Sequence, residues 1–426
     1  MRSASPTAPH HRVAAVGGGP SNLSLAALAE DVVPGSLAIY ERRGEPAWHP
    51  GQLTPGSRLQ TTWLKDLVSL ADPRNRLSFL NYLVTTGRVY AFLNAQFDAI
   101  PRLEYARYLA WAATELGTVH YGMDITGIDF ADGRFVLDTA DRTVATADHV
   151  VIGLGTRAHV PPCLRGADLD GVLLAEQMDA HLTAAQSAPY EQVLVVGGGQ
   201  TGAECVLNLV SRGFRDIRWL GRRHWFAPLD DSPSANDFFR PTYLRFFQGL
   251  PSQTRQRYVA EQSLTSDGIT MATLQELYRV NYEAFLRDGR CPVMMLPGRN
   301  VVEAASRHGS VTLWCERDWG GRERHTARYV MLATGREQCP LPFTPRLRDL
   351  VETDTDGEPV VEQDYSIRWK HSPEHRIFVQ NRARFSHGLA DPNLSLLAVR
   401  SAVIINSLLD RDVFVIRDDQ VSTVWT

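Results

Sequence analysis

Apolar and polar positions follow the same order in two stretches of this chain that lie about 180 residues apart. Each stretch has a short apolar run, a glycine-rich turn and an apolar helical segment, over residues 13–29 and residues 193–210. A second apolar run follows each, at residues 37–40 and residues 217–220. The pattern predicts two strand–helix–strand units, each with glycines between its first strand and its helix.

A longer segment with a different pattern follows each of the two units. Residues 48–109 are irregular and then helical, with many aromatic side chains, and residues 229–292 are polar, aromatic and mostly helical. Further short buried strands and one long apolar helix are predicted at residues 150–155, 330–335, 377–380 and 394–409.

Composition narrows the class of protein. The chain has 426 residues, 44% of them apolar, which is enough for two or three domains. A net charge of −4 argues against a nucleic-acid partner. No run of apolar residues is long enough for stable membrane insertion, and Met1–Arg12 lacks the apolar stretch of a signal peptide.

The cysteines are five in number and scattered, without a CxxC pair. This usage favours a reducing, cytoplasmic compartment and argues against a disulfide framework, a metal site or a dithiol redox centre. The five are Cys163, Cys205, Cys291, Cys315 and Cys339.

Glycine turns between a strand and a helix let backbone N–H groups approach a pyrophosphate at the positive end of the helix. The first turn has Asn22 where the third glycine of the motif is usual, which modifies the motif without breaking it. We expect FAD on Gly17, Gly19, Pro20 and Asn22, and NADPH on Gly197, Gly199, Gln200, Thr201 and Gly202.

The residues that end the second strand of each unit differ in charge. Glu41 ends the first, where a carboxylate can accept hydrogen bonds from a ribose diol. Arg222 and Arg223 follow the second, where arginine suits the 2′-phosphate of NADPH; the alternative is a solvated strand end. The sequence therefore predicts hydride transfer from NADPH to FAD.

The predicted fold is α/β, with two Rossmann-like dinucleotide-binding domains, for FAD and NADPH, and a small helical substrate segment. The chain crosses between the domains at Gly153–Thr156 and Ala333–Gly335. In order, the predicted segments are FAD-binding 12–165, NADPH-binding 166–228, helical insertion 229–292, NADPH-binding 293–340 and FAD-binding 341–426.

Five further blocks follow one another in the chain, at Trp48–Gly51, Leu59–Val68, Leu229–Asn236, Leu264–Thr270 and His387–Leu396. In this order they resemble the lysine/ornithine N-monooxygenases, the N-hydroxylating flavoprotein monooxygenases of siderophore biosynthesis. The lysine-type branch is the most similar.

The resemblance implies N-hydroxylation of the terminal amine of L-lysine, with O2 as co-substrate and a C4a-hydroperoxyflavin as the oxidant. The alternatives are an aliphatic diamine such as putrescine or cadaverine, L-ornithine, or a flavin-binding redox sensor without enzyme activity. We also expect a homo-oligomer, either a dimer or a tetramer.

The same resemblance assigns site residues by position. Gln60 would lie beside the flavin ring, Lys65 would contact a substrate carboxylate, and Ser395 would lie near the substrate amine and the flavin. Asn236 would contact both substrate and nicotinamide, and with Gln60 and Ser395 it makes up the predicted catalytic set. The resemblance adds Trp48, His49 and Leu394 to the FAD site, Ser266 to the substrate site and Asp267 to the NADPH site.

Two positions depart from the family pattern. Thr265–Gly268 stands where ornithine-type members carry Thr-Asn-Tyr-Ser, and the shorter Ser266 points away from ornithine. Arg336 stands where a tyrosine is usual, and nothing in the sequence explains it.

Overall fold

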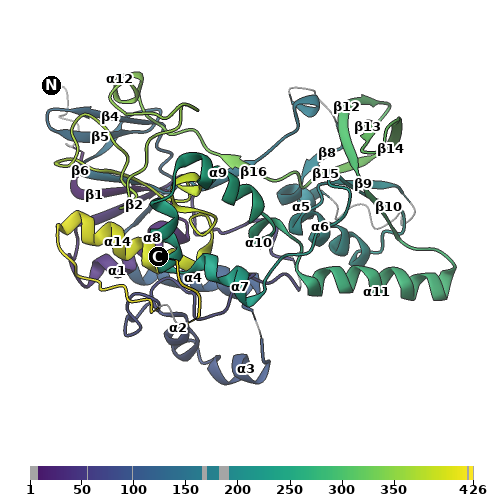
Figure 1. Ribbon diagram of the computed structural model, residues 1–426, viewed down its shortest axis with the longest axis horizontal. Helices are drawn as coiled ribbons and strands as arrows, with labels where there is room; N and C mark the ends of the chain where they lie inside the picture. Colours follow the sequence, from purple (N-terminus) through teal and green to yellow (C-terminus); the bar gives the residue numbers. More distant parts are fainter. Residues whose placement is uncertain are drawn as a thin grey trace, which may run out of the picture.

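Two separate β-sheets, each covered by helices, make up the computed structural model (Figure 1). It describes residues 8–425 except 55, 98, 166–169, 182–190 and 420–421. Both sheets are built around parallel strands, so the predicted α/β fold is confirmed. The residues at which the five predicted segments divide stay a prediction.

The first sheet has seven strands in the order β3-β2-β1-β6-β5-β4, with β17 also beside β6. Strand β6 is long enough for its first half to pair with β5 and its last residues with β17. The strands are β1 (His10–Val16), β2 (Leu37–Glu41), β3 (Val119–Tyr121), β4 (Gly127–Ala131), β5 (Arg134–Asp138), β6 (Thr143–Ile152) and β17 (Ile377–Val379).

Helix α1 (Pro20–Glu30) is the central helix of this sheet and packs against α4 (Arg102–Leu116) and α14 (Leu397–Leu409). Its residues from Ser21 to Ala29 are all buried, which the small and apolar side chains allow. Short helices α2 (Phe79–Thr85) and α3 (Val89–Asn94) join the same core, and α12 (Pro345–Arg348) lies beside β4.

The second sheet is wholly parallel, in the order β11-β10-β9-β15-β8. Helices α6 (Gln200–Ser211) and α11 (Met271–Asp288) pack together in the core on one face. The strands are β8 (Val172–Leu174), β9 (Val193–Val196), β10 (Ile217–Gly221), β11 (Val293–Pro297) and β15 (Tyr329–Leu332).

A three-stranded antiparallel sheet covers the other face, and the pattern of apolar residues does not predict it. Its strands are β12 (Arg299–Arg307), β13 (Ser310–Arg317) and β14 (Arg322–Ala327). Alternate residues of β13 are buried, among them Val311, Leu313 and Cys315, so each strand shows only a few apolar positions in its sequence.

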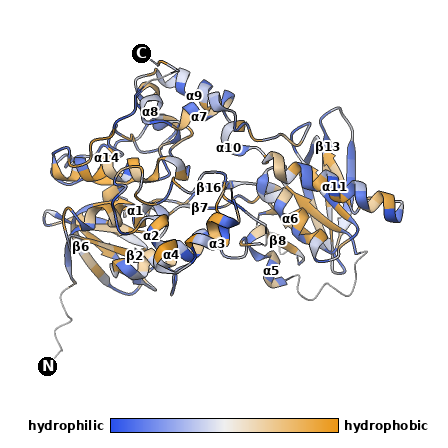
Figure 2. Cartoon of the chain, turned by 90° about the horizontal axis from the view of Figure 1, so that it is seen from below, coloured by the Kyte–Doolittle hydropathy of each residue, from blue (hydrophilic) through white to orange (hydrophobic). Residues whose placement is uncertain are grey.

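The two halves are joined by the chain crossings that the sequence predicts. The outgoing strand β7 (Thr156–Ala158) and the returning strand β16 (Arg336–Gln338) pair antiparallel in the middle of the molecule (Figure 2). Arg336 lies in this ribbon, where its guanidinium donates to the Thr156 hydroxyl at 2.7 Å and pairs with Glu176 at 3.3 Å.

The helical insertion divides its packing between the halves. Helices α8 (Pro241–Gln248) and α9 (Ser252–Glu261) pack against α13 (Arg384–His387), whereas α11 packs on α6 beneath the second sheet. The other short elements are helices α5 (Met178–His181), α7 (Pro233–Asn236) and α10 (Leu264–Asp267), and 3-10 turns at Pro162–Leu164, Ala175–Gln177, Asp237–Phe239 and Leu394–Leu396.

In the described part of the chain, none of the helices is both long enough and apolar enough to cross a bilayer. The same part of the chain holds no group of three His, Cys, Asp or Glu residues placed to bind a metal ion. The five cysteines are free.

Candidate functional site

A cleft of about 2670 Å³ lies where the carboxyl ends of strands from both sheets meet. Its lining includes both glycine turns, Gly17–Gly19 and Gly197–Gly199, and both crossing segments. The volume is several times the 300–1,000 Å³ of a typical small-molecule pocket. Such a space can hold two dinucleotides and a substrate, and ligands of α/β sheets bind at this edge.

The first glycine turn requires glycine at its first position. Gly17 has a φ of +101°, and a Cβ there would lie 2.4 Å from the carbonyl oxygen of Gly153 in the crossing segment. Glu41 lies against the turn, since its Oε2 accepts a hydrogen bond from the Gly18 amide at 2.6 Å. The turn and the predicted ribose acceptor therefore lie together in the cleft.

Asn22 lies beneath this turn rather than in the cleft. Its Nδ2 donates to the carbonyl oxygens of Val16 and Gly17 at 3.1 and 2.8 Å, and its Oδ1 accepts from Gln380 at 2.7 Å. The side chain is fully buried. Asn22 thus supports the turn from within, and its predicted place in the FAD site stays a prediction.

In the second turn a tryptophan, rather than an asparagine, donates to the carbonyl oxygen of the first glycine. Gly197 has a φ of +132°, and its carbonyl oxygen accepts from the indole nitrogen of Trp219 at 2.7 Å. A Cβ at Gly202 would lie 2.1 Å from that oxygen and 2.9 Å from the indole nitrogen. In both turns, therefore, a side-chain N–H satisfies the carbonyl of the first glycine.

The charges at the two strand ends differ as the sequence predicts. Arg222 and Arg223 are exposed, line the cleft just after β10, and have no side-chain hydrogen bond or ion pair within the described ranges. Two unpaired guanidinium groups at this position are suited to a phosphate.

Gln200, at the start of α6, takes part in a network that reaches the first half of the molecule. Its Nε2 donates to Glu204 at 2.8 Å and to Thr273 at 3.2 Å, and its Oε1 accepts from the Thr270 amide at 2.9 Å. Glu204 in turn accepts from Arg102 of α4. Neither Arg102 nor Glu204 is predicted from the sequence, because the residues around each of them give no sign of a partner 102 positions away.

Lys65 and Ser395, which are 330 residues apart in sequence, come together in the structure. The Lys65 Nζ atom donates to the Ser395 hydroxyl at 3.2 Å. Burial lowers the pKa of Lys65, and the described residues offer its ammonium no acidic partner. A half-buried cation with only a hydroxyl beside it lacks a counter-charge, which an anionic ligand would supply.

The backbone next to Lys65 is held firmly. Asp66 is buried and accepts hydrogen bonds from the amides of Val68 at 2.9 Å, Ser69 at 2.7 Å and Phe79 at 2.7 Å. The carbonyl of Leu67 accepts from the Ser24 hydroxyl of α1 at 2.6 Å. Lys65 is therefore placed by the core of the first half rather than by a free loop.

His49 lies in the cleft in a positive-φ conformation, with a φ of +46°. Burial lowers its pKa to about 4, so its imidazole is neutral at physiological pH. Its Nδ1 lies 3.2 Å from the Gln52 amide oxygen. The neighbouring Trp48 ring stacks edge-on at 4.4 Å.

Most of the predicted site residues line the cleft. They are Gly17, Gly19, Pro20, Glu41, Trp48, His49, Gln60, Gly197, Gly199, Gln200, Thr201, Arg222, Arg223, Ser266, Asp267 and Leu394. Five do not belong to its lining, namely Asn22, Lys65, Gly202, Asn236 and Ser395.

Of these five residues, Asn236 is the exposed one. It is exposed at the end of α7, and its amide donates to the carbonyl oxygens of Asp231 and Ser232 at 2.9 and 3.2 Å. Asp267, by contrast, lines the cleft and pairs there with Arg384 at 3.3 Å. The predicted roles of these residues stay predictions.

A buried ion pair beneath the first turn is absent from the sequence predictions. Arg400 of α14 pairs with Asp391 at 3.1 Å, and both side chains are almost completely buried. Arg400 also donates to Ser21 at 3.0 Å and to Gln380 at 3.2 Å, and Gln380 contacts Asn22. The sequence did carry a signal, because Arg400 is the one charged residue in α14.

Comparison with known proteins gives a consistent result over nearly the whole chain. Residues 9–338 match the family described as L-lysine 6-monooxygenase/L-ornithine 5-monooxygenase. The L-lysine N6-monooxygenase of Escherichia coli is 34% identical over 407 residues, which cover 94% of each chain. The putrescine N-hydroxylase of Acinetobacter baumannii is 30% identical, over 94% of this chain and 90% of its own.

A solved structure shares the fold. The ornithine N-hydroxylase of Kutzneria sp. 744, determined with reduced FAD, NADP+ and L-ornithine, has a TM-score of 0.87 and 26% sequence identity. The alignment covers 94% of this chain and 99% of that one.

Proposed function

This chain belongs to the L-lysine 6-monooxygenase/L-ornithine 5-monooxygenase family, and on that basis we propose that it hydroxylates the terminal amine of L-lysine, with FAD and NADPH as cofactors. It is a flavin-dependent N-monooxygenase. The product is an N-hydroxylamine for hydroxamate siderophore biosynthesis. The choice of an amino acid over a diamine rests on the contacts of Lys65, and the choice of L-lysine over L-ornithine rests on Ser266 and on the similarity to the Escherichia coli lysine enzyme.

The residues of the first turn fit FAD. A Cβ would close the space at Gly17, the helix α1 begins at Pro20 with free amides, and the Glu41 carboxylate lies at the end of β2. When bound, FAD would accept hydride from NADPH and activate O2, so that one oxygen atom reaches the amine and the other leaves as water. Gln60, exposed in the cleft, offers an amide to the ring edge.

The residues of the second turn fit NADPH. Gly197–Gly199 would hold the pyrophosphate at the start of α6, and Arg222 and Arg223 would hold the 2′-phosphate. A carboxylate, which NAD would need for its ribose, is absent from this strand end within the described ranges.

Lys65 carries the proposal for an amino-acid substrate. Its ammonium has a hydroxyl partner and no acidic one, so a substrate carboxylate would supply the missing charge. The chain has only two lysines, Lys65 and Lys370, among its 44 basic residues. The other basic residues are nearly all arginine, so a lysine here indicates a site that needs the compact ammonium charge rather than the planar guanidinium of arginine.

The substrate amine must lose its proton before it can react. The pKa of a free lysine amine is about 10.4, and transfer into a cleft shielded from water lowers it. Ser395, whose hydroxyl lies beside Lys65, would orient the substrate, and Asn236 would contact it if α7 moves toward the cleft. The described residues need supply no strong base, because burial itself favours the neutral amine.

An aliphatic diamine is the second candidate. The putrescine N-hydroxylase of Acinetobacter baumannii is nearly as similar to this chain as the lysine enzyme of Escherichia coli. A diamine, however, would place a second ammonium beside Lys65 and be repelled by it.

A substrate panel tests the proposal. L-lysine, L-ornithine, cadaverine, putrescine and diaminopropane would each be incubated with the FAD-loaded enzyme, NADPH and O2, and the hydroxylated product measured. We expect hydroxylation of L-lysine well above that of the others. Faster hydroxylation of cadaverine than of L-lysine would contradict the amino-acid assignment, and NADPH oxidation without any hydroxylated product would favour the redox sensor.

A further inference from the structure

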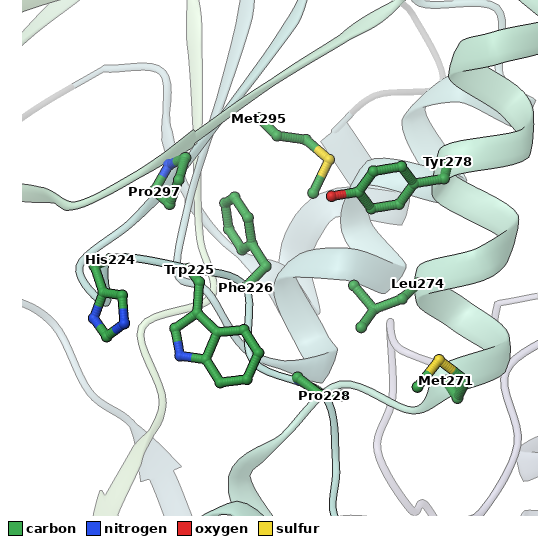
Figure 3. Close-up of a pocket in the computed structure, with 9 residues that line it drawn as sticks. All are labelled: His224, Trp225, Phe226, Pro228, Met271, Leu274, Tyr278, Met295 and Pro297. Carbon is green, nitrogen blue, oxygen red and sulfur yellow. The ribbon is translucent and has the colours of Figure 1, made fainter.

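The helical insertion leaves the second half of the molecule and returns to it at one place. The Leu229 amide donates to the carbonyl oxygen of Ile269 at 2.7 Å, which joins the two ends of the segment between them. Figure 3 shows this base, where Pro228 and Met271 both line a pocket of about 410 Å³. We call residues 230–268 the excursion, and its position beyond the base depends on what it contacts at its far end.

The far end of the excursion packs on the first half of the molecule. Helices α8 and α9 of the excursion contact α13. Phe239 and Leu244 share an apolar cluster with Leu396, the residue that follows Ser395 in the chain. Asn236, which is predicted to contact the substrate, precedes Phe239 by less than one helical turn. The position of Asn236 relative to Ser395 therefore depends on how firmly this end is held.

The chain that follows α14 runs back to the far end of the excursion (Figure 1). Asn406 of α14 holds its start, because Oδ1 accepts from the Phe414 amide at 2.9 Å and Nδ2 donates to the Phe414 carbonyl at 2.8 Å. The side chains of Phe414 and Ile416 pack against the core of the first half. We call the described part of this chain, residues 413–419 and 422–425, the strap.

Asp418 of the strap binds the start of α8. Its Oδ1 accepts from the Arg240 guanidinium, with Nη2 at 2.7 Å and Nε at 3.1 Å, and its Oδ2 accepts from the Thr242 amide at 2.9 Å. The Asp418 side chain is only 12% exposed. A carboxylate at this end of a helix satisfies a free amide and the positive end of the helix dipole. Helix α8 has no side-chain cap of its own next to it, so Asp418 supplies one from 176 residues away.

Two further strap residues contact the excursion on either side of this ion pair. The Thr423 hydroxyl donates to the carboxylate of Asp237, the residue directly after Asn236. The Trp425 ring packs edge-on against Tyr243 of α8, with ring centres 4.8 Å apart. The strap therefore holds the excursion from the end of α7 into α8.

We propose that Asp418 is a positioning residue for amine hydroxylation, because the strap fixes the point from which α7 carries Asn236 toward the substrate beside Ser395. In this structure the Asn236 amide donates only within its own turn, to Asp231 and Ser232, among the described residues. Its approach to the first half is therefore set by the backbone that follows it. The inference rests on the proposed function, since it takes the hydroxylated amine as the ligand of Asn236.

The loss of this contact should weaken amine binding without altering the chemistry. A cleft residue that loses its fixed support spends less time in the productive geometry, so more amine is needed to occupy the site. Once the amine is bound and Asn236 is in place, the reacting groups are the same as in the wild type. A contact that only stabilised the fold would instead lower the amount of active enzyme and leave KM as it was.

Steady-state kinetics of the FAD-loaded enzyme with NADPH, O2 and L-lysine tests this expectation. Asp418→Ala should raise KM for L-lysine about 10-fold and change kcat by less than about twofold. Asp418→Asn keeps an oxygen for the Thr242 amide but loses the charge beside Arg240, so its KM should be intermediate. Asp419→Ala is the matched control, because this neighbouring side chain is exposed and pairs with no described residue.

A double variant tests whether the effect passes through the ion pair. Arg240→Met should raise KM by a similar factor, and Arg240→Met/Asp418→Ala should raise it no further, because both changes remove the same contact. Flavin absorbance and circular dichroism would show that each variant folds. A KM for Asp418→Ala equal to that of the wild type would overturn the positioning role.

Hydrogen exchange measured by mass spectrometry tests the strap apart from the reaction. In Asp418→Ala the amides of residues 237–248 should exchange about 10-fold faster than in the wild type, because their local opening is no longer opposed. The amides of α11, which packs in the second half, should exchange as before. Unchanged exchange over residues 237–248 would overturn the inference.

The two measurements separate this inference from the proposed function. A wild type that hydroxylates none of the amines in the substrate panel would overturn the proposed function and with it the role of Asp418 in the reaction. Hydrogen exchange would still decide whether the strap holds the excursion. Faster exchange together with an unchanged KM would limit Asp418 to a role in stability and overturn its positioning role.

Discussion

Arg102 and Glu204 join the two halves of the molecule through one ion pair. The Arg102 Nη1 atom of α4 donates to Glu204 Oε2 of α6 at 2.7 Å, and both side chains are largely buried. Glu204 also accepts from Gln200, which lines the cleft at the second glycine turn. The pair therefore couples the position of the NADPH-side turn to the FAD-side helix.

The variant Arg102→Met should reduce the rate of flavin reduction by NADPH about 10-fold, because the two sites lose a fixed relative position. Reoxidation of the reduced flavin by O2 needs no second site and should be unchanged. Anaerobic stopped-flow absorbance measures the first rate and mixing with oxygenated buffer the second. The charge-swapped variant Arg102→Glu/Glu204→Arg should recover part of the loss, and Arg76→Met, which breaks a surface pair with Glu30, should have no effect.

Removal of the Lys65 ammonium should change KM differently for amino-acid substrates and for diamines. We expect Lys65→Met to raise KM for L-lysine by 10- to 100-fold, since a charge-assisted hydrogen bond to the carboxylate is lost. KM for cadaverine should stay the same or fall. Product formation with each substrate gives both values, and Lys370→Met, at an exposed position, is the control. Equal losses on both substrates would speak against a carboxylate contact.

The two cleft arginines should determine the choice of nicotinamide cofactor. Arg222→Ser/Arg223→Ser is expected to raise KM for NADPH by at least 10-fold and to leave KM for NADH unchanged, because NADH lacks the 2′-phosphate. Steady-state kinetics with both cofactors measures the change. Arg324→Ser, on an exposed strand of the same half and outside the cleft lining, should behave as the wild type. Equal effects on both cofactors would assign the arginines to another contact.

Buried His387 should make stability depend on pH. Burial lowers its pKa to about 4, whereas the unfolded chain has an ordinary value of about 6.5. Between these values the unfolded state binds a proton that the folded state does not, so the free energy of unfolding is highest above pH 6.5 and falls as the pH drops toward 4.

From pH 7.5 to pH 5 this histidine should account for a loss of about 2 kcal/mol. Urea titrations of the wild type and His387→Phe at both pH values measure the difference. The variant should lose less stability over this range, and His181→Asn, at an exposed position, should lose as much as the wild type.

The ion pair between Arg400 and Asp391 should be necessary for the first turn. Arg400→Met leaves the Asp391 carboxylate buried without its partner, which costs on the order of 3–5 kcal/mol of stability. The affinity for FAD should fall as well, because Arg400 supports Asn22 through Gln380. Thermal unfolding and FAD titration of the apoprotein measure the two effects. A variant with unchanged FAD affinity would limit the pair to a role in stability.

Much of the fold follows from local pattern. The two strand–turn–helix units, the crossing segments and the parallel strands were all predicted, because a buried strand and an apolar helix leave a periodic signal in sequence. The antiparallel sheet β12–β14 was not, since its half-exposed strands show few apolar positions each. The helical insertion was predicted as one segment. Its packing partners could not be predicted, because the apolar pattern of a helix does not identify the core against which the helix packs.

The sequence by itself determined where the two glycine turns lie and which charge follows each, because those features depend on residues that are close together in the chain. Only the tertiary structure decided that Lys65 meets Ser395 and that Arg102 meets Glu204. Such contacts depend on how two sheets and their helices pack across more than a hundred residues, and side-chain periodicity carries no information about that packing.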